Sequence, residues 1–298
     1  MAGRTPEGNA SGACPGMTSP REGRSMKFST KCFLHVQYAV GRLAVVFIAL
    51  LAIIVMRVLG YRVRDMKEIR RKVREAFQTH DGPWVICPNH LTMIDSIVIE
   101  YAIIPLYRYI GNYRLLPWNL PERANFHTNP IFTFLCYLTK CIPISRGGDR
   151  DRMRETLAKC NYLLQRKESI LIFPEGGRSR TGFVSEDSFS YGVGRFIMAN
   201  RSCRVLCVYM RGDGQKTYSG IPRPGERFTM DIEPFDPHTE ERGLKGQREY
   251  ARQIVEHLAV MEKRYFETCG QRHHRSDDHR RDRKEPRYPI HKKSLHHV

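Results

Sequence analysis

Two short apolar runs in this chain are each followed directly by a cluster of polar residues. The run at 84–87 (WVIC) precedes the stretch 89–95 (NHLTMID), and the run at 169–172 (SILI) precedes 173–180 (FPEGGRSR). Short continuous apolar runs are typical of buried strands. Two polar motifs at the ends of two such strands predict one active site at one edge of a sheet.

The first motif contains a histidine and an aspartate, His90 and Asp95. On a helix of ~3.6 residues per turn this spacing places the two side chains on different faces. Contact therefore requires His90 to precede a helix that has Asp95 in its first turn. Such a pair can act as a general base and its orienting carboxylate. Alternatively, Thr92-x-x-Asp95 fits a capping box with Thr92 as the N-cap, so Asp95 could simply cap the helix.

The two motifs, in this order and at this separation, resemble the PlsC-type glycerolipid acyltransferases, which acylate lysophosphatidate or glycerol phosphate. That family has a strand ending in arginine between the motifs, and 141–146 (CIPISR) fits this place. The resemblance covers about residues 80–215. Three positions depart from it: Gly177 replaces the usual Thr, Ser145 the usual Asp and Cys207 the usual Pro. These departures leave the acyl-transfer chemistry intact and leave the acceptor open.

Acyl transfer to a hydroxyl needs a group that removes the hydroxyl proton. An imidazole, with a reference pKa of ~6.5, is suited to this task. We expect His90 to be that base, and Asp95 to fix its tautomer and stabilise the imidazolium. The acceptor can attack the thioester directly, which matches the absence of a G-x-S-x-G nucleophile elbow.

The second motif is expected to bind substrate. Backbone N–H groups near Gly176 and Gly177 are candidates to stabilise the tetrahedral oxyanion, and a plain turn is the alternative. By resemblance, Glu175 belongs to the acceptor-binding motif and orients groups there, and Ser179 belongs to the same motif. Arg178 would pair with the acceptor phosphate, because its planar fork matches phosphate oxygens.

Two further cations are candidate phosphate ligands: Arg146, at the end of the intervening strand, and more weakly Lys140. A surface salt bridge is the alternative role for each of these cations, Arg178 included.

The expected activity is that of a membrane-bound acyltransferase. It would move a fatty acyl group from acyl-CoA or acyl carrier protein to a lysophospholipid hydroxyl. Conversion of 1-acylglycerol-3-phosphate to phosphatidic acid is the leading reaction, and another lysolipid, such as a lyso-aminolipid, is the alternative. No metal and no cofactor besides the acyl donor, a co-substrate, is expected.

Two other classes of function explain less of the sequence. A metal-dependent hydrolase could use His90, Asp95 and Glu175 as ligands, but no second histidine or His-x3-His pair lies nearby. A non-enzymatic binder of nucleic acid or anionic membrane would explain the charge but not the motifs.

The net charge of +18 attracts polyanions. Zinc-finger spacing, RNA-binding aromatic signatures and a clear helix-turn-helix are not found in the sequence, so we expect a membrane partner and no nucleic acid. The nine cysteines are scattered and include no C-x-x-C pair. That usage favours a reduced domain that faces the cytosol.

An apolar segment accompanies the charge. Residues 43–56 are uninterrupted but reach only about 21 Å, short of a ~30 Å hydrocarbon core. If Arg42 and Arg57 snorkel, the wider span 38–61 is long enough. The segment could span once, insert as a re-entrant or interfacial anchor, or form a buried core helix. More basic residues follow it than precede it, which places the following domain in the cytoplasm.

The chain divides into a disordered N-terminus (1–30), a membrane anchor or transmembrane helix (33–61), an acyltransferase domain (62–268) and a disordered basic His-rich tail (270–298). We predict further strands over 113–116, 142–145, 205–209 and 227–232 and helices over 65–78, 130–140, 149–166, 191–199 and 247–266. The alternation predicts an α/β fold: a mixed, mostly parallel sheet flanked by helices, with an N-terminal membrane-anchoring helix.

Overall fold

A computed structural model of the chain describes residues 26–123, 129–145, 150–187 and 189–282. Within these residues six strands form one sheet, in the order β1-β6-β5-β2-β4-β3. The strands are β1 (Arg62–Val63), β2 (Trp84–Pro88), β3 (Trp118–Asn119), β4 (Ile170–Leu171), β5 (Arg204–Gly212) and β6 (Arg227–Phe235). All neighbours pair in parallel except β5 and β6, which are antiparallel. This confirms the mixed, mostly parallel sheet.

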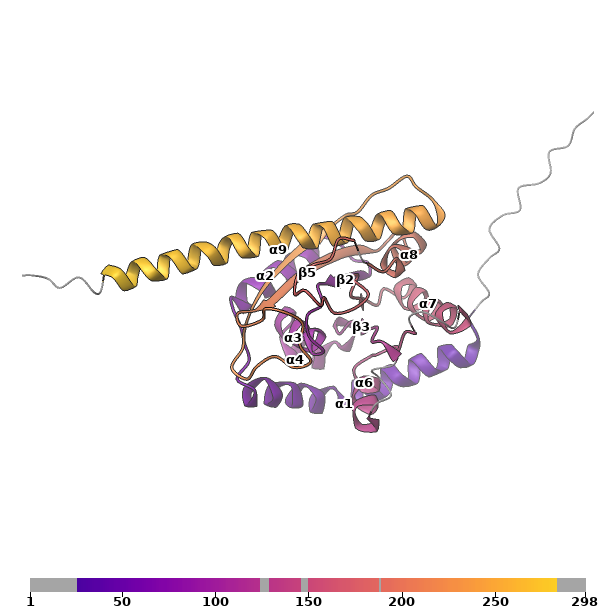
Figure 1. Cartoon of the computed structure of the whole chain (residues 1–298). Helices are drawn as coiled ribbons and strands as arrows, with labels where there is room; N and C mark the ends of the chain where they lie inside the picture. Colours follow the sequence, from indigo (N-terminus) through magenta and orange to yellow (C-terminus); the bar gives the residue numbers. More distant parts are fainter. Residues whose placement is uncertain (1–25, 124–128, 146–149, 188, 283–298) are drawn as a thin grey trace, which may run out of the picture.

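Helices cover both faces of the sheet (Figure 1). They are α1 (Phe28–Val58), α2 (Met66–Gln78), α3 (Asp95–Ile103), α4 (Leu106–Gly111), the 3-10 helix η1 (Tyr113–Leu115), α6 (Pro130–Leu138), α7 (Arg150–Gln165), α8 (Gly192–Ala199) and α9 (Gly243–Asp282).

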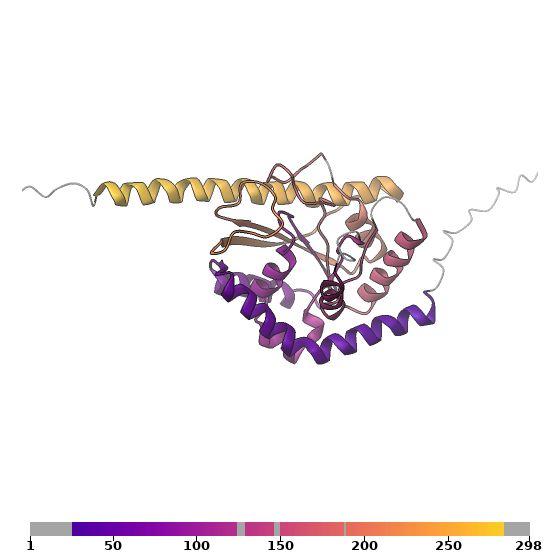
Figure 2. The ribbon, with the colours of Figure 1, turned by 60° about the horizontal axis from the view of Figure 1, so that its bottom comes forward.

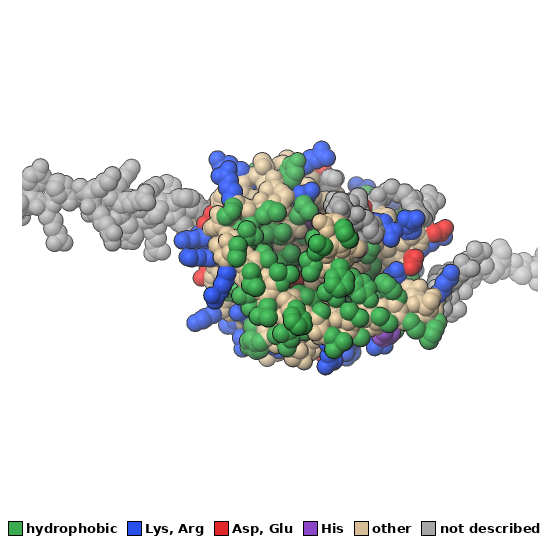
Figure 3. Space-filling model, turned by 90° about the horizontal axis from the view of Figure 1, so that it is seen from below, with side chains coloured by type: hydrophobic (Ala, Val, Ile, Leu, Met, Phe, Trp, Pro, Cys, Tyr) green, Lys and Arg blue, Asp and Glu red, His purple; other side chains and the backbone are tan. Residues whose placement is uncertain are grey.

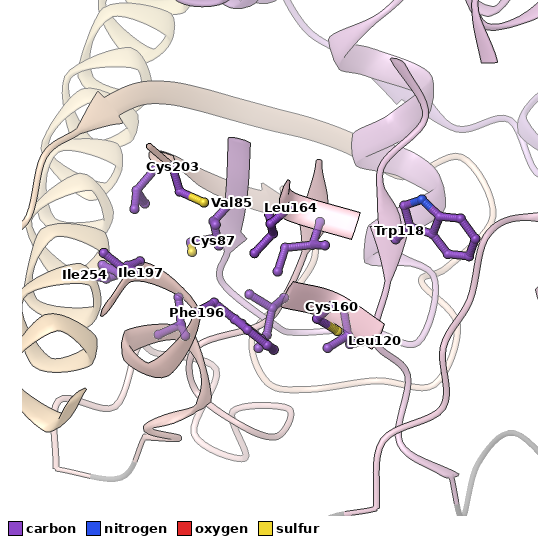
Figure 4. Close-up of a cluster of buried hydrophobic side chains, with 14 of the residues drawn as sticks. Val85, Cys87, Trp118, Leu120, Cys160, Leu164, Phe196, Ile197, Cys203 and Ile254 are labelled. Atoms are coloured by element: carbon purple, nitrogen blue, oxygen red, sulfur yellow. The ribbon is translucent and has the colours of Figure 1, made fainter. Parts of the chain in front are cut away.

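The core has two halves because successive side chains of a strand point to opposite faces. On β2, Val85 and Cys87 pack with buried residues of α7, α8 and α9 (Figure 4). Trp84 and Ile86 point the other way and pack with α2 and α3. All four side chains are buried, so β2 forms the centre of the molecule.

Two predicted strands differ in the structure. Residues 113–115 form η1, because the Tyr113 hydroxyl donates to the Leu138 carbonyl at 2.7 Å and holds that ring under α1. The strand comes later, at Trp118–Asn119. The segment 142–145 has one isolated bridge, at Ile144, and Pro143, which lacks an N–H group, interrupts it. The short strand β1 was not predicted.

The described part of the chain begins and ends with a long helix, and these two helices, α1 and α9, lie on opposite sides of the domain (Figure 2). Helix α9 continues to Asp282, past the predicted helix end at 266 and into the segment assigned to the disordered tail. Residues 283–298, and residues 1–25 of the N-terminus predicted to be disordered (1–30), lie outside the described part of the chain, whereas 28–30 belong to α1. The proposed domain boundaries stay predictions.

Helix α1 lies lengthwise against the domain. One stripe of it is buried: Leu34, Gln37, Gly41, Val45, Ala49 and Met56. Gln37 ties it down by donating to two backbone carbonyls at 3.0 Å each, those of Tyr137 and Cys141. At Gly41 there is no room for a Cβ, because the Tyr113 hydroxyl and the Leu138 carbonyl occupy the space. The opposite side of α1 is exposed and apolar, and the helix is long and apolar enough to cross a membrane.

Candidate active site

The site lies where β2 ends. Asn89 fixes this end to β5: its Nδ2 donates to the Met210 carbonyl at 3.1 Å, and its Oδ1 accepts the Met210 N–H at 2.7 Å. The Asn89 N–H donates to the Val208 carbonyl at 3.1 Å. A buried asparagine with both amide atoms paired therefore sets the position of the next residue, His90.

His90 and Asp95 are in contact. The His90 Nδ1 lies 3.1 Å from the Asp95 Oδ2. The same carboxylate accepts the N–H groups of Leu91 and Thr92, at 2.7 and 2.8 Å, and the Thr92 hydroxyl at 2.5 Å. A carboxylate surrounded by donors acts as an acceptor, so the neutral tautomer that fits this contact has its hydrogen on Nδ1 of His90 and its lone pair on Nε2. Asp95 is 2% exposed and His90 is 17% exposed, which leaves the ring accessible at one side.

The structure combines the two interpretations of Asp95. Helix α3 begins at Asp95 and its N-cap is Ile94, which makes no side-chain cap, so the predicted N-cap at Thr92 is wrong. Asp95 nevertheless accepts the Thr92 N–H, as the carboxylate of a capping box does. One carboxylate therefore orders the turn before α3 and orients the His90 ring.

The second motif holds His90 from three sides. The Phe173 ring stacks on the imidazole with centroids 3.9 Å apart. The Glu175 Oε1 accepts the His90 N–H at 2.8 Å, and the Ser179 N–H donates to the His90 carbonyl at 2.9 Å. The two motifs thus meet at one edge of the sheet, as the sequence predicted.

Glu175 lies inside this junction. Burial raises the pKa of its carboxyl from 4.5 to about 8, against the opposing effect of the His90 N–H. The nearby carboxyl groups of Glu262 and Asp95 raise the pKa further. Its role in the structure is to hold the backbone at His90.

Of the two glycines predicted to stabilise the oxyanion, only one keeps its N–H group available within the described part of the chain. Gly176 has φ 73° and its N–H donates to the Phe173 carbonyl at 3.1 Å, so this group is used in a turn. Among the described residues the Gly177 N–H has no backbone acceptor, and a Cβ there would meet nothing within 4 Å. The Ser179 hydroxyl donates to the Phe183 carbonyl and therefore closes the loop on itself.

The predicted phosphate cations lie in different places. Arg178 is partly exposed, donates from Nη1 to the Ser219 carbonyl at 3.3 Å and lies over the Tyr218 ring. Arg146 lies outside the described residues. Lys140 is fully buried and paired with Glu168 at 2.9 Å, with its pKa lowered to about 8 chiefly by burial, so it cannot bind a phosphate from solvent.

The loop of residues 213–226, between β5 and β6, also borders the site and was missed by sequence reasoning. The Ser219 N–H donates to the Leu91 carbonyl, and the Met93 N–H donates to the Gly220 carbonyl, both at 3.0 Å. Its glycines and prolines indicate a loop, but they do not indicate that this loop lies beside the site. The basic residues Lys216 and Arg223 were the features of this loop that could have indicated an anion-binding role.

A family model described as acyltransferase matches residues 61–211, more than half of the chain. The chain belongs to this acyltransferase family, that of PlsC and 1-acylglycerol-3-phosphate O-acyltransferase. A search of curated proteins with this chain found no match. The matched region of this acyltransferase contains both motifs and ends inside β5, before the 213–226 loop. Within the described residues no group of three or more His, Cys, Asp or Glu side chains is placed to hold a metal ion.

Proposed function

We propose that this acyltransferase is membrane-bound and transfers a fatty acyl group from an acyl thioester to the hydroxyl of a lysophospholipid. The leading reaction is conversion of 1-acylglycerol-3-phosphate to phosphatidic acid, with another lysolipid as the alternative acceptor. The donor is acyl-CoA or acyl carrier protein. The observation that carries the proposal is the His90–Asp95 pair, whose ring is oriented with Nε2 as a proton acceptor.

The proposed reaction needs no acylated side chain. The acceptor hydroxyl gives its proton to the His90 Nε2 while its oxygen attacks the thioester carbonyl. Asp95 stabilises the imidazolium that forms. The Gly177 N–H is the candidate donor to the tetrahedral oxyanion. Collapse of this intermediate breaks the C–S bond, and the proton on His90 passes to the departing thiolate.

Arg178 is the candidate ligand of the acceptor phosphate. Among the described residues its hydrogen bond to the Ser219 carbonyl engages Nη1 alone, whereas a guanidinium has five N–H donors. The remaining donors can meet an anionic headgroup. This role rests on the motif and on the position of Arg178 in the same loop as Ser179, which contacts His90.

Helix α1 supports membrane attachment. The domain covers its buried stripe from Leu34 to Met56, so the helix cannot cross a bilayer without carrying the domain into it. Its outward side chains include Leu43, Phe47 and Val58, exposed by 74–81%. Together with exposed residues of α6, such as Ile131 and Phe134, they give this face a broad hydrophobic surface with basic residues at its margin (Figure 3). We propose that α1 lies in the plane of the membrane interface, with the domain on the cytoplasmic side.

Two measurements test these proposals. Purified protein in vesicles receives labelled acyl-CoA or acyl carrier protein and a panel of lysolipids, and transfer to lysophosphatidate is expected to be fastest. Transfer to no lysolipid would reject the proposed activity. In a flotation assay the protein is expected to stay on vesicles at high salt, because burial of apolar side chains is insensitive to screening. Release by salt would show that α1 is not an anchor.

A further inference from the structure

The 213–226 loop is a third wall of the site. Strand β5 runs parallel to β2, and β6 returns antiparallel, so their connection lies at the edge where both motifs lie. The bonds of Ser219 to Leu91 and of Met93 to Gly220 place the loop directly beside the turn that follows His90. The family match ends at residue 211 and therefore does not include this loop.

The loop also contacts the second motif. Arg178 touches it twice, through the Ser219 carbonyl and through the Tyr218 ring, whose centre is 5.7 Å from the Arg178 Cζ. Close by, Gly182 has φ 80°, and a Cβ there would collide with the Lys216 carbonyl. The direction of the Arg178 guanidinium therefore depends on the position of the 213–226 loop.

The loop lines a cavity of about 310 Å³ that is open to solvent on one side. Tyr218 and Ser219, the two residues that Arg178 contacts, both line it. Two exposed cations, Lys216 and Arg223, line it as well. The acidic group in the lining is Glu226, whose Oε1 accepts the Gly214 N–H at 2.9 Å and so stabilises the loop.

We propose that this cavity binds the phosphate monoester of the acceptor headgroup, with Lys216 and Arg223 as counter-charges and Arg178 in contact with the lining residues Tyr218 and Ser219. A phosphate monoester carries roughly −1.5 to −2 charges near neutral pH, which suits a site with more than one cation. The 213–226 loop then determines acceptor specificity. This inference rests on the proposed acyl transfer to a lysophospholipid.

Phosphate groups reach such a site from two sources, the acceptor and the nucleotide part of acyl-CoA. In lysophosphatidate only a short carbon stretch separates the reacting hydroxyl from the phosphate. The phosphate must therefore bind on a wall adjacent to His90, as this loop is. In acyl-CoA the long pantetheine arm separates the thioester from the phosphates, so they bind farther from the reacting carbonyl. The geometry favours the acceptor.

The kinetic test removes both cations, in the double variant Lys216→Ala/Arg223→Ala. For lysophosphatidate its KM is expected to rise about 10- to 100-fold, as for the loss of charge-assisted contacts, with kcat little changed. The KM for acyl-CoA and the rate with a monoacylglycerol, which lacks the phosphate, are expected to stay within a factor of two of wild type. Arg242→Ala/Lys245→Ala removes two exposed cations near the start of α9 and is the matched control.

Two kinetic results would overturn the proposal. An equal loss with lysophosphatidate and monoacylglycerol would show that the loop acts on the fold of the site rather than on phosphate. A rise in the KM for acyl-CoA alone would assign the cations to the donor.

A binding measurement separates this inference from the proposed function. Glycerol 3-phosphate is expected to raise the melting temperature of wild type and of the control in detergent, but not that of the double variant. If wild type transfers acyl groups to no lysolipid and this stabilisation is still seen, the proposed function fails and the phosphate site stands. If wild type acylates lysophosphatidate and the double variant matches it, the site fails and the function stands.

Discussion

The two motif loops are built in opposite ways. In the first, the polar side chains are turned toward one another: Asp95 collects four hydrogen bonds, from His90, Leu91 and Thr92. In the second, Glu175 holds the first loop and the Ser179 hydroxyl closes its own loop. Among the described contacts, Arg178 uses only Nη1, so its other N–H donors can bind a ligand. The first loop is therefore organised for a proton transfer, and the second for positioning and binding.

The largest effect is expected from His90→Ala. Loss of a general base typically costs about 10²- to 10⁴-fold in rate, and folding should be retained because the ring is not part of the core. The kcat for acyl transfer measures it. His80→Ala is the matched control, since His80 precedes β2 and its ring contacts Ser202 and Trp84, at the end of β2 away from His90. More than a tenth of the parent activity in His90→Ala would remove this residue from the mechanism.

Asp95→Asn is expected to lower kcat by about 10- to 1,000-fold, because an amide cannot stabilise the imidazolium. Thr92→Ala separates this role from capping, since it removes one bond to the carboxylate and leaves the His90 contact. Its effect should be mainly on the melting temperature. If both variants lose stability and keep turnover, Asp95 only caps α3.

Arg178→Ala is expected to raise the KM for lysophosphatidate about 10- to 100-fold with a smaller change in kcat. Arg180→Ala, which removes an exposed arginine of the same loop, is the control and should be close to wild type. If Arg178→Ala lowered kcat as much as His90→Ala does, the assignment of proton transfer to the first loop and binding to the second would be wrong. An equal effect on a phosphate-free acceptor would argue against phosphate binding.

The smallest effect on activity is expected from Glu175→Gln, because the amide oxygen can still accept the His90 N–H. Its effect should appear in the pH dependence of stability. The folded carboxyl has a pKa of about 8 instead of 4.5, so the folded state holds a proton that the unfolded state releases. The contribution of this carboxyl to the free energy of unfolding of wild type therefore falls as the pH rises from 4.5 to 8.

Glutamine at this position does not titrate, so the variant should lose less stability over this window, by up to about 1.4 kcal/mol for each pH unit between the two pKa values. Denaturant unfolding at both ends of the window measures the difference. Parallel pH profiles for the two proteins would show that Glu175 is ionised in the fold.

The sequence predicted what depends on local pattern. The apolar run of β2 and the helices α2 and α7 were located correctly, because burial imposes a periodicity that the residues carry. It did not predict η1, since Tyr113 is buried by contacts with distant residues rather than by strand pairing. The contact of His90 with Asp95 was predicted only as one of two alternatives.

The functions of individual second-motif residues were harder to predict. Whether Glu175 faces substrate or the His90 backbone depends on two segments that meet only after folding. The same holds for Lys140, whose charge suggests a surface site although it pairs with Glu168 in the interior. The 213–226 loop has no motif at all, and its contribution follows from the antiparallel return of β6.

The 213–226 loop is also tied to the end of α1. The Gly225 N–H donates to the Leu59 carbonyl at 2.6 Å, and the Tyr61 hydroxyl donates to the Pro222 carbonyl at 2.7 Å. If α1 rests in the membrane interface, its depth sets the height of the loop above the hydrocarbon. A lysolipid could then present its headgroup to the enzyme while its acyl chain stays among the lipids. Extraction of the whole substrate from the bilayer, which would expose a fatty chain to water, would be unnecessary.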